Sequence, residues 1–191
     1  MEKMSKHESH NQNLLEGVRV LELANVVAGP LTGSLLADFG AEVIKVELPG
    51  QGDTMRYAGP KKNGIGLWWK VSGRNKKNIT LDLRVPKGQE ICKNLVSKCD
   101  ALIENFRPGT LEKWNLGWED LKKVAPELIM LRISGYGQTG PYSPRPGFGR
   151  AAEAMSGVMQ ITGYPGQRPI SPGFSLGDTV SGLTGAWKLG S

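Results

Sequence analysis

The chain has 191 residues and a mass of 20.7 kDa, a length that suits one domain. Hydrophobic residues make up 39% and charged residues 22%, which excludes wholesale disorder. No run approaches the roughly 20 apolar residues of a membrane-spanning helix, so we expect no membrane contact. Residues 1–13 are polar and lack the apolar stretch of a secretory signal. We predict that they form a disordered tail.

The formal charge of +6 raises the question of a nucleic-acid partner. The basic residues are spread along the chain, and aromatic residues do not alternate with them as in single-strand binders. A basic surface also suits a small anionic ligand that carries phosphates. We therefore predict no nucleic-acid partner.

The only histidines, His7 and His10, lie in the polar tail. Within the folded part this excludes Ser-His-Asp and Cys-His catalysis and argues against a metal site, so we predict no bound metal. Cys92 and Cys99 are too few for a disulfide scaffold or a four-cysteine zinc site. We expect both to be reduced, as in a cytoplasmic protein.

Hydrophobic strands alternate with helical patterns along the chain. The predicted strands are residues 18–23, 42–47, 79–83, 100–104 and 128–133. The predicted helices are residues 30–39, 86–98, one or two short helices in 110–124, and stretches near 149–160 and 178–187. In the helix predicted at 86–98, the side chains of Ile91, Leu95 and Cys99 are expected to share one face. Residues 49–78 are rich in Gly, Pro and Lys and are predicted to form a long loop.

This alternation predicts the α/β class: an open, mostly parallel, Rossmann-like sheet with helices on both faces. Ligands of such sheets bind where the strands end. Two local motifs remain weak. Residues 135–140 match GxGxxG, but Pro141 and Pro144 oppose a helix after them. Gly29 and Pro30 open a helix whose N-terminus suits either an anion or a tight turn without a ligand.

The strongest pattern is a series of seven segments in order between residues 14 and 185: LLEGVRVLELANVVAGP, LLADFGAEVIKVELPGQGD, GRNKKNITLDLR, ENFRPGTLEKWNLGWEDL, ISGYGQTGPY, MSGVMQITG and PGFSLGDTVSG. Together they resemble the family III CoA-transferases, the carnitine CoA-transferase and formyl-CoA transferase group. The resemblance implies transfer of coenzyme A from an acyl-CoA to a small free carboxylic acid, with both as substrates and no permanently bound cofactor.

The resemblance further implies a nucleophile at Asp178, which forms an anhydride with the acyl group and then a thioester with CoA. A carboxylate is ionised at neutral pH without a partner base, so the missing histidines fit this chemistry. The alternative is that Asp178 only caps a helix starting there, and both roles can coexist.

The resemblance also implies contacts with CoA. By position, Val26 and Ala28 line the pantetheine arm and thioester, while Leu81 and Arg84 lie near the adenine. The residues expected around the phosphates and the base are Asn105, Phe106, Arg107 and Lys113, where Arg107 is favoured by its charge.

The sequence departs from the family at three positions. Val27 replaces a glutamine of formyl-transferring members, and Phe148 replaces the catalytic histidine of related racemases, which argues against both activities. Gly149 stands where many relatives carry an acid. Glu153 lies one helical turn later, and a solvated helix charge is its favoured interpretation.

The resemblance covers residues 14–191 as a large domain that ends before the family's small domain. Family members are longer and form interlocked homodimers, so we expect exposed apolar surface here. The predicted function is an acyl-CoA:carboxylate CoA-transferase. The alternative is a CoA-binding or interaction remnant without turnover.

Overall fold

The computed structural model describes residues 13–190, so the predicted tail lies outside the described residues apart from Asn13. The strands are β1 (Arg19–Glu22), β2 (Glu42–Glu47), β3 (Lys61–Lys62), β4 (Ile65–Gly66), β5 (Lys76–Thr80), β6 (Ala101–Glu104) and β7 (Ile129–Arg132). The helices are α1 (Ala28–Asp38), the 3-10 turn η1 (Thr54–Arg56), α2 (Leu67–Ser72), α3 (Pro86–Val96), α4 (Thr110–Lys113), α5 (Trp118–Leu121), α6 (Gly149–Met155) and α7 (Leu176–Leu189).

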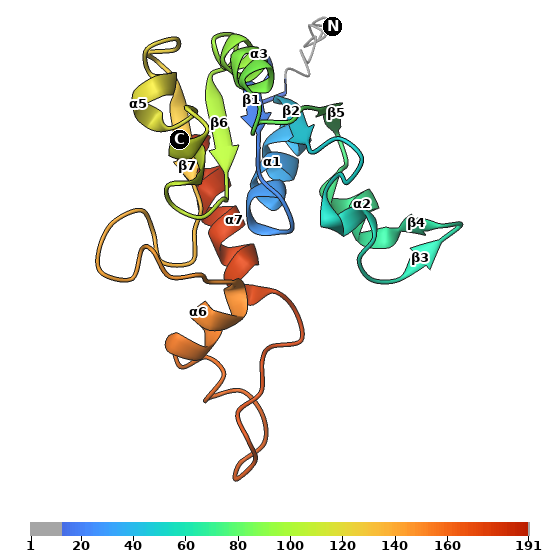
Figure 1. Ribbon diagram of the computed structural model, residues 1–191. Coiled ribbons are helices and arrows are strands. Elements are labelled where there is room, and N and C mark those ends of the chain that lie inside the picture. Colours follow the sequence, from blue (N-terminus) through green and yellow to red (C-terminus); the bar gives the residue numbers. More distant parts are fainter. Residues whose placement is uncertain (1–12, 191) are drawn as a thin grey trace, which may run out of the picture.

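Five strands form one sheet in the order β5-β2-β1-β6-β7, and every pairing in it is parallel. Strands β3 and β4 form a small antiparallel hairpin that projects from the sheet (Figure 1). The chain winds from β1 toward β2 in one direction and from β1 toward β6 in the other. The predicted open α/β sheet is therefore confirmed.

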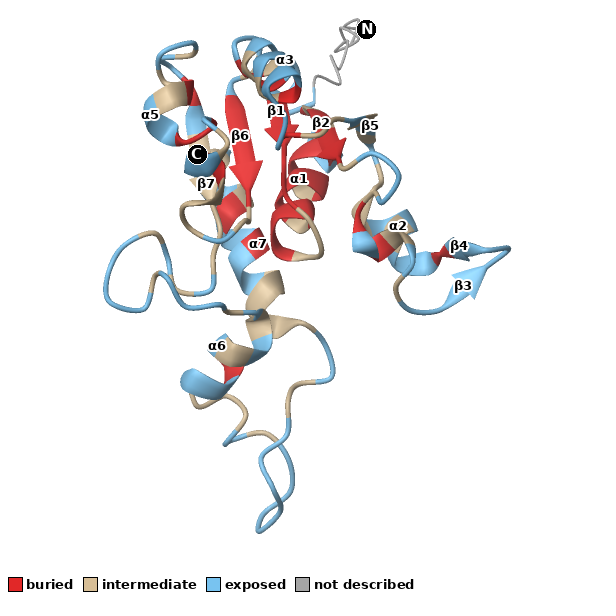
Figure 2. Cartoon of the chain, viewed as in Figure 1, coloured by how far each residue is buried: buried red, intermediate tan, exposed pale blue. Residues whose placement is uncertain are grey.

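Both faces of the sheet are buried, as a parallel sheet requires. Leu21 and Leu102 point to one face and pack against α3, α4 and α5, while their neighbours Val20 and Ile103 point to the other face, against α1 and α7. Figure 2 shows the consequence: buried residues concentrate in β1, β2, β6 and α1, whereas α6 and the loops beside it are mostly exposed or intermediate.

Helix α7 lies against α1 because two of its glycines allow close approach. A Cβ at Gly182 would stand 2.8 Å from the carbonyl oxygen of Ala28, and one at Gly185 would stand 3.0 Å from Oγ1 of Thr32. The Thr32 hydroxyl also donates to the carbonyl of Gly182 at 3.0 Å. The start of α7 is thereby held at a fixed distance from the start of α1.

Several predicted boundaries were wrong. The strand expected at 79–83 is Lys76–Thr80. It begins earlier than predicted because the Lys76 side chain is buried in an ion pair with Glu22, whereas a charged residue was expected outside the strand. The loop expected at 49–78 contains η1, the β3–β4 hairpin and α2. On α3 the buried face runs through Cys92 and Val96, and Ile91 is exposed.

Three further properties of the described residues concern membrane-spanning helices, the cysteines and exposed apolar surface. No helix within residues 13–190 is both long and apolar enough to cross a membrane. Cys92 and Cys99 are both free, and burial raises the pKa of the Cys92 thiol to about 12. Helix α7 exposes large apolar side chains: Val180, Leu183 and Trp187.

Candidate active site

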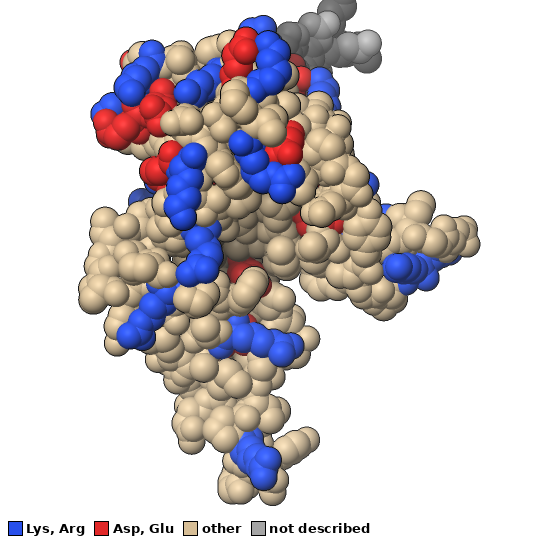
Figure 3. All heavy atoms as spheres, in the orientation of Figure 1, with Lys and Arg blue, Asp and Glu red and all other residues tan. Residues whose placement is uncertain are grey.

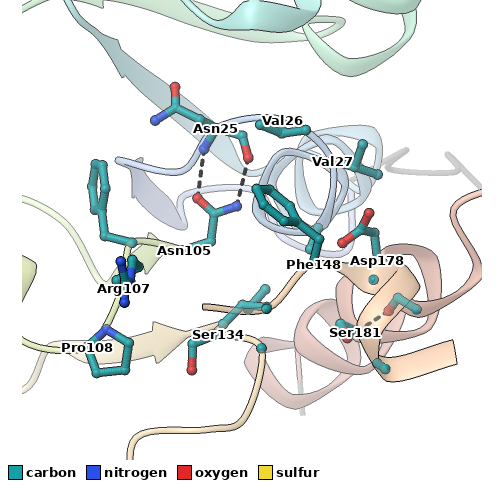
Figure 4. A pocket seen from close by; sticks show the side chains of 18 of the residues that line it. Asn25, Val26, Val27, Asn105, Arg107, Pro108, Ser134, Phe148, Asp178 and Ser181 are labelled. Carbon is teal, nitrogen blue, oxygen red and sulfur yellow. Dashed lines mark hydrogen bonds between the residues drawn. The ribbon is translucent and has the colours of Figure 1, made fainter. Parts of the chain in front are cut away.

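The strand order reverses direction between β1 and β6, and the loops after these two strands meet there. The amide of Asn25, after β1, donates to Oδ1 of Asn105 at 2.8 Å, and Nδ2 of Asn105 donates to the carbonyl of Asn25 at 2.7 Å (Figure 4). This reciprocal pair joins the two loops. In open α/β sheets such a reversal point is where ligands bind.

A cavity of about 220 Å³, here called the central cavity, opens beside this junction. Its walls come from the loops after β1, β6 and β7 and from the first turns of α6 and α7. The residues that line it include Asn25, Val26, Val27, Ala28, Asn105, Phe106, Arg107, Phe148, Gly149 and Asp178. Figure 3 shows a hollow on this face with acidic atoms inside it and Lys and Arg side chains along its rim.

A second space of about 330 Å³, the side cavity, lies between the loops after β1, β2 and β5. It is lined by residues that include Leu81, Asp82 and Arg84. Asn25, Val26 and Phe106 line both cavities, so the two form neighbouring parts of one groove.

Asp178 lies in the first turn of α7 and borders the central cavity. The helix begins at Leu176 with Ser175 in the N-cap position, so the interpretation of Asp178 as the N-cap is wrong. A carboxylate in a first helical turn is favoured by the helix dipole. Among the described residues its oxygens have no hydrogen-bond or ion-pair partner, which leaves them available to a ligand.

Glu153, on α6, is the second carboxylate of the site. Its side chain accepts hydrogen bonds from Oγ of Ser171 at 2.7 Å and from the amide of Gly177 at 3.2 Å. The residue is only 3% exposed, so the expectation of a solvated helix charge was wrong. The bond from Ser171 leads the causes that lower the pKa of Glu153. Because Gly177 precedes Asp178, Glu153 holds the start of α7.

The two carboxylates also interact through charge. Burial raises the pKa of Asp178, and the negative charge of Glu153 raises it further. Both causes disfavour the ionised form of Asp178, and an anion that is poorly stabilised is a stronger nucleophile.

We expect Glu153→Gln to lower the pKa of Asp178, because the like charge is removed while burial remains. The acid limb of any reaction at Asp178 should then move to lower pH. The measurement is a titration of the Asp178 carboxyl by NMR, with the exposed, distant Glu127→Gln as control. An unchanged or raised pKa in Glu153→Gln would contradict this electrostatic coupling.

Gly149 explains how α6 and α7 meet. A Cβ at Gly149 would stand 3.1 Å from Cγ and Oδ2 of Asp178, so this position has little room for a side chain. Helices α6 and α7 therefore meet here through close backbone contact. Phe148, 77% exposed, lines the central cavity beside Asp178 (Figure 4). Asp178 also borders a third space of about 980 Å³, which shares Phe148 and Gly149 with the central cavity.

The structure brings together most of the residues predicted to contact CoA. Val26, Ala28, Asn105, Phe106 and Arg107 line the central cavity, and Leu81 and Arg84 line the side cavity. Arg84 is held by two bonds to Asp82, and this pairing lowers the pKa of Asp82 to about 2. Phe106 packs edge-on against Trp114, with ring centroids 5.3 Å apart.

Lys113 is the exception, since it is exposed at the end of α4 and lines neither cavity. Asn105 lines the central cavity, but both ends of its side-chain amide bond to Asn25. The GxGxxG string at 135–140 is followed by loop rather than helix, so it does not form a dinucleotide site. Among residues 13–190 no cluster of His, Cys, Asp and Glu has the arrangement of a metal site.

A family model described as CoA-transferase family III matches residues 15–189. The chain belongs to this family. The CoA-transferase family III chain is 57% identical over 168 residues to a succinyl-CoA–D-citramalate CoA-transferase of Chloroflexus aurantiacus, covering 87% of this chain and 42% of that protein. It is 46% identical over 175 residues to the human succinyl-CoA:glutarate CoA-transferase, covering 91% of this chain and 40% of that protein.

Two solved structures share this fold. A CAIB/BAIF family protein from Brucella suis superposes with a TM-score of 0.86 at 39% identity, covering 91% of this chain and 47% of that chain. The hypothetical protein Rv3272 of Mycobacterium tuberculosis superposes with a TM-score of 0.84 at 38% identity, covering 92% of this chain and 49% of that chain. The family III chain thus spans less than half the length of these relatives.

Proposed function

We propose that this chain carries the nucleophile and CoA groove of an acyl-CoA:carboxylate CoA-transferase. The observation that carries the proposal is the carboxylate of Asp178, which is unpaired among the described residues, partly buried and open to a cavity at the reversal point of the sheet. Membership of CoA-transferase family III supports the same chemistry.

The proposed reaction begins when an oxygen of Asp178 attacks the thioester carbonyl of an acyl-CoA. The C–S bond breaks, CoA leaves as a thiolate, and a mixed anhydride joins the aspartyl and acyl groups. The thiolate then attacks the aspartyl carbonyl, which releases the first acid as its carboxylate and leaves CoA bound to Asp178 as a thioester. The acceptor carboxylate attacks this thioester and forms a new anhydride. The freed thiolate attacks the acceptor's carbonyl, which yields the new acyl-CoA and regenerates Asp178.

The residues that line the groove support a specific position for each part of CoA. Val26 and Ala28 would contact the pantetheine arm close to Asp178, and Leu81 and Arg84 would contact the adenine in the side cavity. Arg107 would supply a cation for the phosphates, since guanidinium groups bind phosphate oxygens in a fixed fork. Asn105 would act mainly by joining the two loops, and Phe106 would line the point where the cavities meet. Lys113 would need CoA to extend beyond both cavities.

The names of the relatives support a substrate class. They pair succinyl-CoA with D-citramalate, L-malate or glutarate, which are all dicarboxylic acids. We therefore propose succinyl-CoA as donor and a small dicarboxylic acid as acceptor. The homodimer and the cytoplasmic location remain predictions. Three of the relatives are named as an alpha or a beta subunit.

The test is to trap the acyl-enzyme or CoA-enzyme bond. The protein is incubated with succinyl-CoA and then hydroxylamine, and its peptides are analysed by mass spectrometry. We expect a hydroxamate on the peptide that contains Asp178. Binding of CoA without any such label would instead support the alternative, a CoA-binding chain without turnover, and would overturn the proposed chemistry.

A further inference from the structure

Four charged side chains form a continuous buried chain beneath the groove. The Lys76 ammonium lies 2.7 Å from Oε2 of Glu22, and the Lys45 ammonium lies 2.8 Å from Oε1 of Glu22 and 2.9 Å from Oδ2 of Asp53. Each of these side chains is at most 1% exposed. The signs alternate and the charges sum to zero, as a buried ionic cluster needs if no charge is to remain uncompensated.

Both lysines of this buried cluster also bind the backbone of the segment that runs from the end of β1 into the first turn of α1. Lys45 donates to the carbonyl of Ala24 at 2.7 Å, and Lys76 donates to the carbonyl of Pro30 at 2.6 Å. Burial works against the charge of Lys45, but Glu22 and Asp53 outweigh it and hold the pKa of Lys45 above its ordinary value. The four buried charged side chains therefore hold both ends of the segment at residues 24–30.

Asp53 holds the middle of the same turn. Its two carboxylate oxygens accept from the amide of Val26 at 3.2 and 3.3 Å. Val26 has a φ of +69°, a left-handed conformation that is rare and strained for a β-branched residue. Such a conformation persists only where its surroundings enforce it. Asp53 holds the Val26 amide directly, while the two lysines and the pair between Asn25 and Asn105 hold the backbone on either side of it.

We propose that Asp53 is a positioning residue that keeps the Val26 turn in the conformation required for CoA binding. This inference rests on the proposed function for the identity of the ligand. Val26 lines both the central and the side cavity, and Val27 and Ala28 continue the wall toward Asp178. Without Asp53 the strained turn relaxes, and its side chains no longer border the groove in the same way.

The first readout is hydrogen exchange of the Val26 amide, measured by NMR without any ligand. In Asp53→Asn the acceptor is neutral and no longer pairs with Lys45, so we expect exchange at Val26 to quicken by at least about tenfold while the amides of β1 keep their rates. The matched control is Asp38→Asn, an exposed carboxylate bound to Arg74 and far from the turn. Unchanged protection of the Val26 amide in Asp53→Asn would overturn the inference.

The second readout is the affinity for CoA, measured by calorimetry. We expect Asp53→Asn to weaken binding about tenfold and Asp38→Asn to leave it unchanged. Val26→Gly removes the conformational penalty, so in that background Asp53→Asn should weaken binding much less. Equal losses in both backgrounds, or no loss in either, would overturn the positioning role.

The two readouts separate this inference from the proposed function. If the unaltered protein fails to bind CoA, the proposed function fails, while the exchange measurement still decides whether Asp53 holds the turn. If Asp53→Asn does not fold, the same substitution is made in the Val26→Gly protein, where glycine adopts the left-handed conformation without strain. The double variant should then fold and bind CoA nearly as well as Val26→Gly alone, and failure to fold in this background as well would overturn the positioning role.

Discussion

Asp178→Asn should abolish the covalent step: formation of the enzyme–CoA bond from succinyl-CoA is expected to fall by at least about 10³-fold. An amide keeps the size and much of the polarity of the carboxylate but has no anionic oxygen with which to attack a thioester. Intact-protein mass spectrometry after incubation with succinyl-CoA measures the bound CoA. The control is Asp120→Asn, a surface carboxylate on α5 that pairs with Lys123.

The same substitution should leave thermal stability unchanged or raise it. The pKa of Asp178 is raised by burial and by Glu153, so folding disfavours its charge. A carboxyl group whose pKa is raised by folding lowers the free energy of unfolding at any pH above the pKa that it has in the unfolded chain. Asparagine is neutral at every pH, so the substitution removes this destabilisation. A lost reaction together with an undiminished melting temperature identifies a functional group. Undiminished CoA attachment in Asp178→Asn would refute the proposed nucleophile, and a large fall in melting temperature would indicate a structural role.

Lys45→Met should destabilise the fold by about 3–5 kcal/mol, because it removes one partner from a buried ionic cluster. Methionine has nearly the length of lysine but no charge, so Glu22 keeps only Lys76 and Asp53 loses its cation. The free energy of unfolding is measured by urea denaturation. The effect should be accompanied by faster exchange of amides in the turn at residues 24–30.

The matched control is Lys77→Met, one residue along β5 from Lys76. The Lys77 side chain is 71% exposed and pairs with Glu42 at the surface. Such a pair contributes at most about 1 kcal/mol, so Lys77→Met should change stability far less. Similar losses for the two lysines would mean that the buried chain has no special part in stability.

Hydrophobic pattern was enough to predict the central strands, because parallel strands buried on both faces are apolar along their length. It failed at β5, where an edge strand begins with Lys76 and Lys77. It also failed in residues 49–78, where the short hairpin and α2 have no long apolar period. Polar segments of this kind are fixed by tertiary contacts, such as the bonds between Arg56 and Glu47.

The residues of the candidate site were likewise predicted only in part. Asp178 and the residues of the groove followed from motifs that keep their order along the chain. Glu153 and Asp53 were missed as structural partners, because their significance lies in contacts with backbone amides far away in sequence. One signal was present: Glu22, Lys45 and Glu47 are charged residues within strands otherwise apolar enough to be buried, and buried charges need partners.

The lack of side chains at Gly182 and Gly185 fixes the distance between two parts of the proposed active site. Because these glycines let α7 rest directly on α1, the spacing of the two helices sets the distance from the Val26 turn to Asp178. The exposed loops around the groove can vary in sequence to admit acids of different shape while this distance stays constant. Altered selectivity should therefore be sought in those loops, and an alanine at either glycine should impair every substrate alike.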